Sequence, residues 1–154
     1  METYVEVINA VLSSAPPGMT VGIHVCRGNR RGFWQAEAGY EFMSDQLFRR
    51  LQASFYFLEF DSPRAGPLDA LRFMPDHKTV VLGLITTKSP QLESREMLRK
   101  RVEEASAYVS KDRLCLSPQC GFSGNIGNTV MTADEQAAKL RLVVDTARSL
   151  WDEP

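Results

Sequence analysis

Apolar runs and amphipathic stretches alternate along the whole chain. Four runs are rich in β-branched and aromatic residues and predict strands, over residues 20–26, 54–60, 79–87 and 113–118. The third run, TVVLGLITT, is almost continuously apolar, which is typical of a strand buried on both faces of a parallel sheet.

Helical spacing or turn residues fill the stretches between these runs. Helices are predicted over residues 3–14, 40–51, 68–73, 91–109 and 132–151. Thr132 and Glu135 fit a capping box at the start of the last helix. We expect its buried stripe to consist of Leu140, Val143, Val144, Ala147 and Trp151. Strands that alternate with helices predict an α/β fold with parallel pairing and right-handed crossovers.

Composition adds limits rather than a function. The 154 residues predict a single domain, 1–154, long enough to bury a sizeable core. A net charge of −1 provides no basic field for nucleic acid or a membrane surface. No apolar run approaches the ~18 residues that span a bilayer, and the first residues lack the features of a signal peptide. Three cysteines, an odd number, argue against a disulfide framework and favour the reducing cytoplasm.

Four residues with metal-binding side chains fall at or just beyond the ends of predicted strands: His24, Cys26, Glu59 and Cys120. Zinc accepts this mixture of sulfur, nitrogen and oxygen ligands. Residues i and i+2 of a strand point to the same side, so His24 and Cys26 can reach one metal ion. Because the other two come from different strands, the set resembles a catalytic zinc site more than a structural one.

Two thiolates and a carboxylate would make such a site net negative, which disfavours the activation of water. Zinc in this setting instead lowers the pKa of an incoming thiol and leaves its sulfur able to attack an electrophile. Glu59 is the hardest ligand of the set, and we expect the substrate thiol to displace it.

Other polar residues near the strand ends allow two interpretations each. Lys88 could protonate or neutralise a leaving group, or it could be a solvated loop lysine. Arg27 could bind a substrate carboxylate, or it could be solvated. Cys115 lies inside a predicted strand, where we expect a small buried hydrophobic residue.

Five segments together resemble the cobalamin-independent methionine synthase family, and most of all its shorter, single-barrel relatives, which carry RGN after the His-x-Cys pair. The segments are HVCRGN (24–29), LEFDSPRAG (58–66), VVLGLITTKSP (80–90), LCLSPQCGF (114–122) and AAKLRLVVDTA (137–147). The resemblance implies a partial (β/α)8 TIM barrel, made of the last four β/α units with a preceding helix. The chain would then be the C-terminal half of the catalytic barrel.

The same resemblance implies a function for the metal-binding residues. It makes His24, Cys26, Glu59 and Cys120 the ligands of a zinc ion that activates homocysteine as its thiolate. The implied enzyme is a 5-methyltetrahydropteroyltriglutamate–homocysteine methyltransferase-like protein of methionine biosynthesis, with methyltetrahydrofolate as one candidate donor. The long methionine synthases carry a histidine, in D-x-H-S-P, where this chain has Lys88, so the methyl donor stays open.

Two other functions stay open beside methyl transfer. One is zinc-dependent alkyl transfer from another donor, as in epoxide:coenzyme M transferases. The other is a non-catalytic fragment that needs a partner half. A half barrel exposes two edge strands, here 20–26 and 113–118. We therefore expect association with a separate N-terminal half barrel or, as the second choice, a homodimer, and we expect activity to depend on the missing half.

Overall fold

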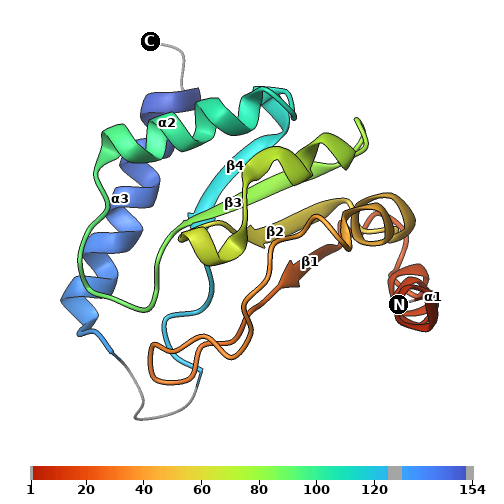
Figure 1. Ribbon diagram of the computed structural model, residues 1–154, viewed down its shortest axis with the longest axis horizontal. Helices are drawn as coiled ribbons and strands as arrows, with labels where there is room; N and C mark the ends of the chain where they lie inside the picture. The colour runs from red at the N-terminus through yellow and green to blue at the C-terminus, as the bar shows by residue number, and fades with distance from the viewer. Residues whose placement is uncertain (1, 125–129, 152–154) are drawn as a thin grey trace.

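The computed structural model describes residues 2–124 and 130–151, and Figure 1 shows the course of the chain. The elements follow in the order α1 (Glu2–Ser13), β1 (Gly22–Val25), η1 (Asp45–Arg50), β2 (Phe55–Glu59), η2 (Pro63–Ala65), η3 (Leu68–Phe73), β3 (Thr79–Ile85), α2 (Arg95–Ser106), η4 (Lys111–Arg113), β4 (Leu114–Pro118) and α3 (Ala133–Trp151). η1 is a π-helical segment, and η2, η3 and η4 are 3₁₀ turns. Within the described ranges no helix is long and apolar enough to cross a membrane.

The four strands form one parallel sheet in the order β1-β2-β3-β4. This arrangement confirms the predicted α/β fold, and every strand lies within the apolar run that predicted it. Three strands end earlier than expected, β1 at Val25, β2 at Glu59 and β3 at Ile85. As a result, Cys26 lies in the loop after β1, and Lys88 lies in the loop after β3, where it was expected.

The helical predictions are more accurate in position than in type. α1 and α3 are α-helices close to the predicted bounds, whereas the predicted helix 68–73 is the 3₁₀ segment η3. The capping box is confirmed, because the Thr132 amide donates to the Glu135 carboxylate at 2.7 Å and the Glu135 amide donates to Thr132 Oγ1 at 3.3 Å. The predicted helix 40–51 is a turn followed by η1.

α2 begins at Arg95 rather than near residue 91, because the side chains of Ser94 and Glu93 prevent the helix from extending toward the N-terminus. Ser94 caps it, and its hydroxyl accepts a hydrogen bond from the Met97 amide at 3.1 Å. Glu93 is turned away from the helix and pairs with the buried ammonium of Lys139 on α3 at 3.1 Å. The Glu93 carboxylate also accepts from the Thr86 amide at 2.8 Å, so it holds the loop after β3 in place.

One face of the sheet carries the core. Alternate strand residues point to this face, where α2, α3, η1 and η3 cover them (Figure 1). The buried residues include Tyr56, Leu58, Val80, Leu82, Leu84, Leu114 and Leu116 from the strands and Phe48, Leu71, Leu98, Val102 and Leu142 from the covering helices. Burial of one such side chain stabilises the fold by about 1.5–3 kcal/mol, so this layer fixes the sheet on which the functional residues stand.

The expected stripe of α3 is wrong at two positions. Leu140 and Val144 are 43% and 47% exposed, whereas Lys139, Leu142 and Thr146 are buried. The helix packs against β4 through the face that contains Leu142, and Lys139 can lie in that face because Glu93 neutralises it. Leu140 and Val144 are therefore left on a side of α3 that no described residue covers.

The opposite face of the sheet is open. His24, Phe57, Val81 and Cys115 occupy matching positions on the four strands and point to this face. Phe57 is 39% exposed and Cys115 is also exposed, so the expectation that Cys115 is buried is wrong. The physical reason is that only one face of this sheet is covered by the described part of the chain.

Candidate metal centre

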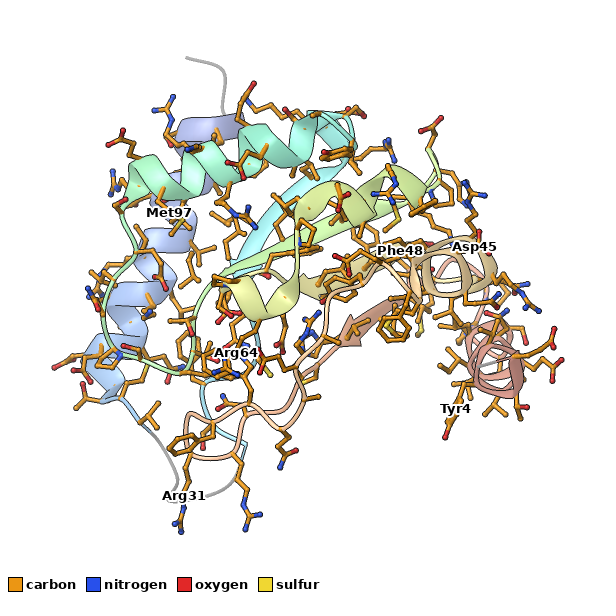
Figure 2. All side chains as sticks on the ribbon, viewed as in Figure 1. Tyr4, Arg31, Asp45, Phe48, Arg64 and Met97 are labelled. Atoms are coloured by element: carbon orange, nitrogen blue, oxygen red, sulfur yellow. The ribbon has the colours of Figure 1, made fainter. Side chains whose placement is uncertain are left out.

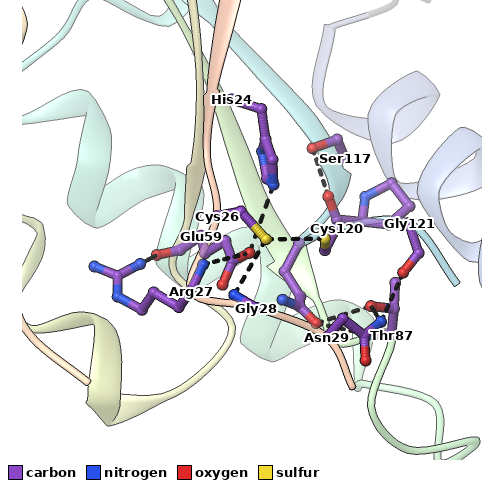
Figure 3. A network of polar contacts seen from close by, with 12 residues as sticks. His24, Cys26, Arg27, Gly28, Asn29, Glu59, Thr87, Ser117, Cys120 and Gly121 are labelled. Atoms are coloured by element: carbon purple, nitrogen blue, oxygen red, sulfur yellow. Dashed lines mark hydrogen bonds and ion pairs between the residues drawn. The ribbon is translucent and has the colours of Figure 1, made fainter. Parts of the chain in front are cut away.

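The four predicted ligands meet at the carboxyl edge of the sheet. One ligand atom from each of His24, Cys26, Glu59 and Cys120 lies within 4.8 Å of the others. The two sulfur atoms are 3.4 Å apart, and His24 Nε2 is 3.6 Å from Glu59 Oε1 (Figure 3). A tetrahedral zinc ion with bonds of about 2.0–2.3 Å separates its ligands by roughly 3.3–3.8 Å. The sulfur–sulfur and nitrogen–oxygen separations fall in this range, and all four atoms lie within 4.8 Å of one another, so together they could hold one metal ion.

The sheet explains why residues so distant in sequence converge. His24 lies on β1, Cys26 directly follows that strand, and Glu59 ends the neighbouring β2. Cys120 lies just beyond β4, two strands away from β2, so the intervening strand has to leave room for it. β3 does so with Gly83, where a Cβ atom would lie 2.8 Å from Gln119 Cα and 2.9 Å from the Leu58 carbonyl oxygen. Any larger residue would push β4 away from the cluster.

Glu59 is held from behind by a buried arginine. Glu59 is only 1% exposed, and its Oε1 accepts a hydrogen bond from the Arg27 amide at 3.3 Å. The Arg27 guanidinium donates to the Glu59 carbonyl oxygen at 3.2 Å and to the Tyr40 hydroxyl at 2.8 Å. It also donates to the Ala38 carbonyl oxygen at 2.7 Å. Arg27 is thus a buried structural residue behind Glu59. It is neither solvated nor able to bind a substrate carboxylate, so both interpretations made from the sequence are wrong.

The second carboxylate oxygen of Glu59 could bind a cation. Oε2 is buried and has no hydrogen-bond partner among the described residues. An unsatisfied buried polar atom costs about 1–3 kcal/mol, and more when it is charged. A metal ion next to His24 and the two thiols would compensate that charge. The donor set and this buried oxygen together fit zinc.

The protonation of the two thiols differs. Burial raises the pKa of Cys26 to about 11, against a smaller opposite effect of the Gly28 amide, which donates to its sulfur at 3.2 Å. A hydrogen bond with His24 lowers the pKa of Cys120, and the same bond raises the pKa of His24. Cys120 is therefore the more acidic thiol, and a metal ion would have to displace the proton of Cys26.

Lys88 lies beside the cluster without belonging to it. Its ammonium donates to Gln119 Oε1 at 3.0 Å and lies 5.2 Å from the centre of the Trp34 ring. Gln119 is 1% exposed and directly precedes Cys120. Lys88 is thus a half-buried loop lysine with a fixed partner rather than a freely solvated one, and a catalytic role stays a prediction.

A polar network behind the cluster was not predicted. Asn29 donates through Nδ2 to the Gly121 carbonyl oxygen at 2.8 Å and to Thr87 Oγ1 at 3.3 Å. The Thr87 hydroxyl and amide both donate to Gln119 Oε1, at 2.9 and 3.1 Å. The network ties together the loops after β1, β3 and β4, and two of these loops carry candidate ligands. The only sequence signal for it is the RGN segment, which contains Asn29.

Fold and site together define a class: an α/β protein with a partial parallel barrel and a candidate metal centre at the carboxyl ends of its strands. Within this class, the chain belongs to the family described as cobalamin-independent synthase, catalytic domain, which matches residues 13–149. The resemblance seen in the sequence is therefore confirmed.

Relatives of this family cover nearly the whole chain. The Bacillus subtilis (strain 168) protein YxjH, itself uncharacterized, is 40% identical over 149 residues, which are 96% of this chain and 40% of YxjH. A methionine synthase of Pyrococcus horikoshii is 26% identical over 77% of this chain and 31% of its own length. A Listeria monocytogenes crystal structure, provisionally described as a vitamin-B12 independent methionine synthase, matches with a TM-score of 0.73 and 33% identity. That match covers 99% of this chain and 41% of the Listeria chain.

These matches confirm the partial barrel, because the same four-stranded arrangement recurs in methionine synthase barrels. The chain spans about two fifths of the length of YxjH and of the Listeria protein.

Proposed function

We propose that this chain is the zinc-binding, thiol-activating half of a methyltransferase barrel that acts in methionine synthesis in the cytoplasm. The observation that carries the proposal is the convergence of four ligand atoms within 4.8 Å around a buried carboxylate oxygen with no described partner. Membership in the cobalamin-independent synthase family supports the class of reaction. The acceptor is homocysteine or a similar thiol, and methyltetrahydrofolate is the first candidate donor.

His24, Cys26, Glu59 and Cys120 would hold the zinc ion. When bound, zinc lowers the pKa of the substrate thiol and keeps its sulfur nucleophilic. His24 and Cys26 are exposed on the open face of the sheet, so a substrate would approach from that side. Glu59 lies on the buried side of the site. Its hydrogen bond from the Arg27 amide would stabilise the carboxylate after a substrate thiol has replaced it as a ligand.

Lys88 would act on the donor rather than on the thiol. Its ammonium contacts Trp34 and Gln119, and Gln119 directly precedes the candidate ligand Cys120. This position supports a role in protonating or neutralising a leaving group. The same ammonium supports the second candidate function, alkyl transfer from an epoxide, because opening of an epoxide produces an alkoxide that needs a proton. Incubation of a thiol with methyl and epoxide donors separates the two functions by the thioether formed.

Metal content tests the proposal most directly. We expect one zinc ion per chain in the purified protein, and a loss of at least about tenfold in zinc affinity for Cys120→Ser. The matched control is Cys115→Ser, because Cys115 is an exposed cysteine outside the cluster and should leave zinc unchanged. Substitution by cobalt(II) should give thiolate charge-transfer absorption that Cys120→Ser weakens. Equal zinc content in both variants would refute the assignment of the site.

A further inference from the structure

A pocket of about 500 Å³ lies between the loop that follows β2 and helix α2. This volume is within the range of small-molecule sites, about 300–1,000 Å³. The four candidate metal ligands do not line the pocket, so it is separate from the candidate metal centre. Its apolar walls come from three parts of the fold: Phe60 from the loop, Leu84 from β3 and Met97 from α2.

The loop beside this pocket contains the short turn η2. Pro63 begins the turn, because its ring already holds the backbone angle that a helical turn requires. Gly66 follows the turn with a φ of +74°, a conformation that favours glycine. Arg64 belongs to the same turn, but its guanidinium lies over the Trp34 ring at 4.9 Å from the ring centre. Figure 2 shows Arg64 pointing away from Met97 and α2, so this arginine does not enter the pocket.

Two residues on the loop side of the pocket carry polar atoms without a hydrogen-bond partner in the described part of the chain. These atoms are Asp61 Oδ2 and Ser62 Oγ, and both are shielded from water. Burial of an unpaired polar atom is unfavourable, most of all when the atom is charged. Both oxygens can accept hydrogen bonds, so a positively charged donor such as an ammonium group would satisfy them.

A positive charge lines the pocket from α2. The Arg101 side chain is 28% exposed, and one of its nitrogens pairs with Glu104 at 2.8 Å. The remaining guanidinium nitrogens have no partner within residues 2–124 and 130–151. Two N–H groups of one guanidinium can bind both oxygens of a carboxylate. The pocket therefore combines a negative group on the loop, a positive group on the helix, and apolar walls.

We propose that this pocket binds a free amino acid with an apolar side chain. The ammonium group of the ligand would contact Asp61 and Ser62, its carboxylate would contact Arg101, and its side chain would pack against the apolar walls. Such a zwitterion matches all three features, whereas a simple anion or cation would leave one charged group of the pocket unpaired. Methionine is the first candidate because it is the product of the proposed function, and only this choice of ligand rests on that function.

Isothermal titration calorimetry with L-methionine tests the proposal. We expect one binding site per chain, and L-leucine should bind as well because the pocket selects for charge and an apolar side chain. N-acetylmethionine lacks the ammonium group, and methionine methyl ester lacks the negative carboxylate. Each should bind at least about tenfold more weakly than methionine, since each loses a hydrogen bond to a charged group.

Two variants test the residues that contact the ligand. Asp61→Asn and Arg101→Gln should each weaken methionine binding at least about tenfold. In Arg101→Gln, methionine and its methyl ester should bind with similar affinity, which a general loss of structure would not produce. The matched controls are Asp112→Asn and Arg99→Gln, at exposed positions outside the pocket, and they should bind methionine as the wild type does.

Cys120→Ser separates this pocket from the candidate metal centre. Cys120 does not line the pocket, so the variant should bind methionine with unchanged affinity. Loss of binding in Cys120→Ser would place the amino acid at the metal centre and overturn the proposal. Absence of binding by the wild type would overturn it as well, and so would binding that neither Asp61→Asn nor Arg101→Gln weakens. The titrations need no zinc, so their failure and a failure of the proposed function are separate results.

Discussion

Replacing Glu59 by glutamine separates the cost of burying a charge from the benefit of binding a metal with it. The carboxylate is 1% exposed, one oxygen accepts from the Arg27 amide, and the other has no partner among the described residues. Glutamine keeps the shape of the side chain and the oxygen that Arg27 contacts, and it removes the negative charge. The variant should therefore be more stable than the wild type without zinc and gain less stability than the wild type from zinc.

The expected sizes follow from burial. In the presence of a chelator, removal of the unsatisfied charge should raise the free energy of unfolding by about 1–3 kcal/mol. A chain of this length gains roughly 2–4 °C in melting temperature per kcal/mol. In zinc, loss of one ligand should weaken binding about 100-fold, which removes about 2.7 kcal/mol of ligand-induced stabilisation. Glu59→Gln should thus melt above the wild type in chelator and lose most of that advantage, or fall below it, in zinc.

Thermal unfolding followed by circular dichroism, in chelator and in a zinc buffer, measures both values. Glu93→Gln is the matched control, since it removes a carboxylate from a buried ion pair with Lys139. That variant should lose stability by a similar amount in both conditions. Melting of Glu59→Gln below the wild type in chelator would show that Glu59 is already satisfied without a metal. An unchanged response to zinc would show that Glu59 is no ligand.

Two further predictions concern the supports of the site and of the sheet. Arg27→Lys should weaken zinc binding about 10–100-fold, because lysine cannot reproduce the hydrogen bonds that Arg27 makes behind the ligands. Competition with a chromophoric chelator measures this, and Arg99→Lys, at an exposed position, should show no change. Lys78 is buried and donates to the carbonyl oxygens of Phe48 and Leu51, and burial lowers its pKa. When folding lowers the pKa of a lysine, the protein loses stability as the pH falls through the pKa of the folded state. The wild type should therefore gain stability relative to Lys78→Met between pH 7 and 10, as measured by urea unfolding. A stability difference that stays constant with pH would contradict this.

The local sequence pattern was enough to predict the four strands and the start of α3. Each apolar run became a strand of the parallel sheet, and Thr132 with Glu135 became the cap of α3. The convergence of the four candidate ligands was predictable because parallel strands end at one edge, where the ends of β1, β2 and β4 lie near one another. The distances among them, however, depend on Gly83 and on the curvature of the sheet.

Burial on α3 and around the site depends on partners distant in sequence. Helical periodicity selects Leu140 and Val144 as core residues, but Lys139 is buried instead because Glu93, 46 residues earlier, neutralises it. Asn29 likewise contacts Thr87 across 58 residues, which no local spacing reveals. The exposure of Cys115 reflects the open face of the sheet, a property of the whole arrangement rather than of its strand.

All four candidate ligands, with Arg27 and Tyr40 behind them, lie within four consecutive strands and their loops. Under the proposed function, this placement would separate capture of the metal from closure of the barrel, and it would allow the first to precede the second. A chain that binds zinc early would have the carboxyl edge of its sheet ordered before the barrel closes, so metal binding would favour closure. Supply of zinc during synthesis would then govern how much barrel is made, as well as how active it is.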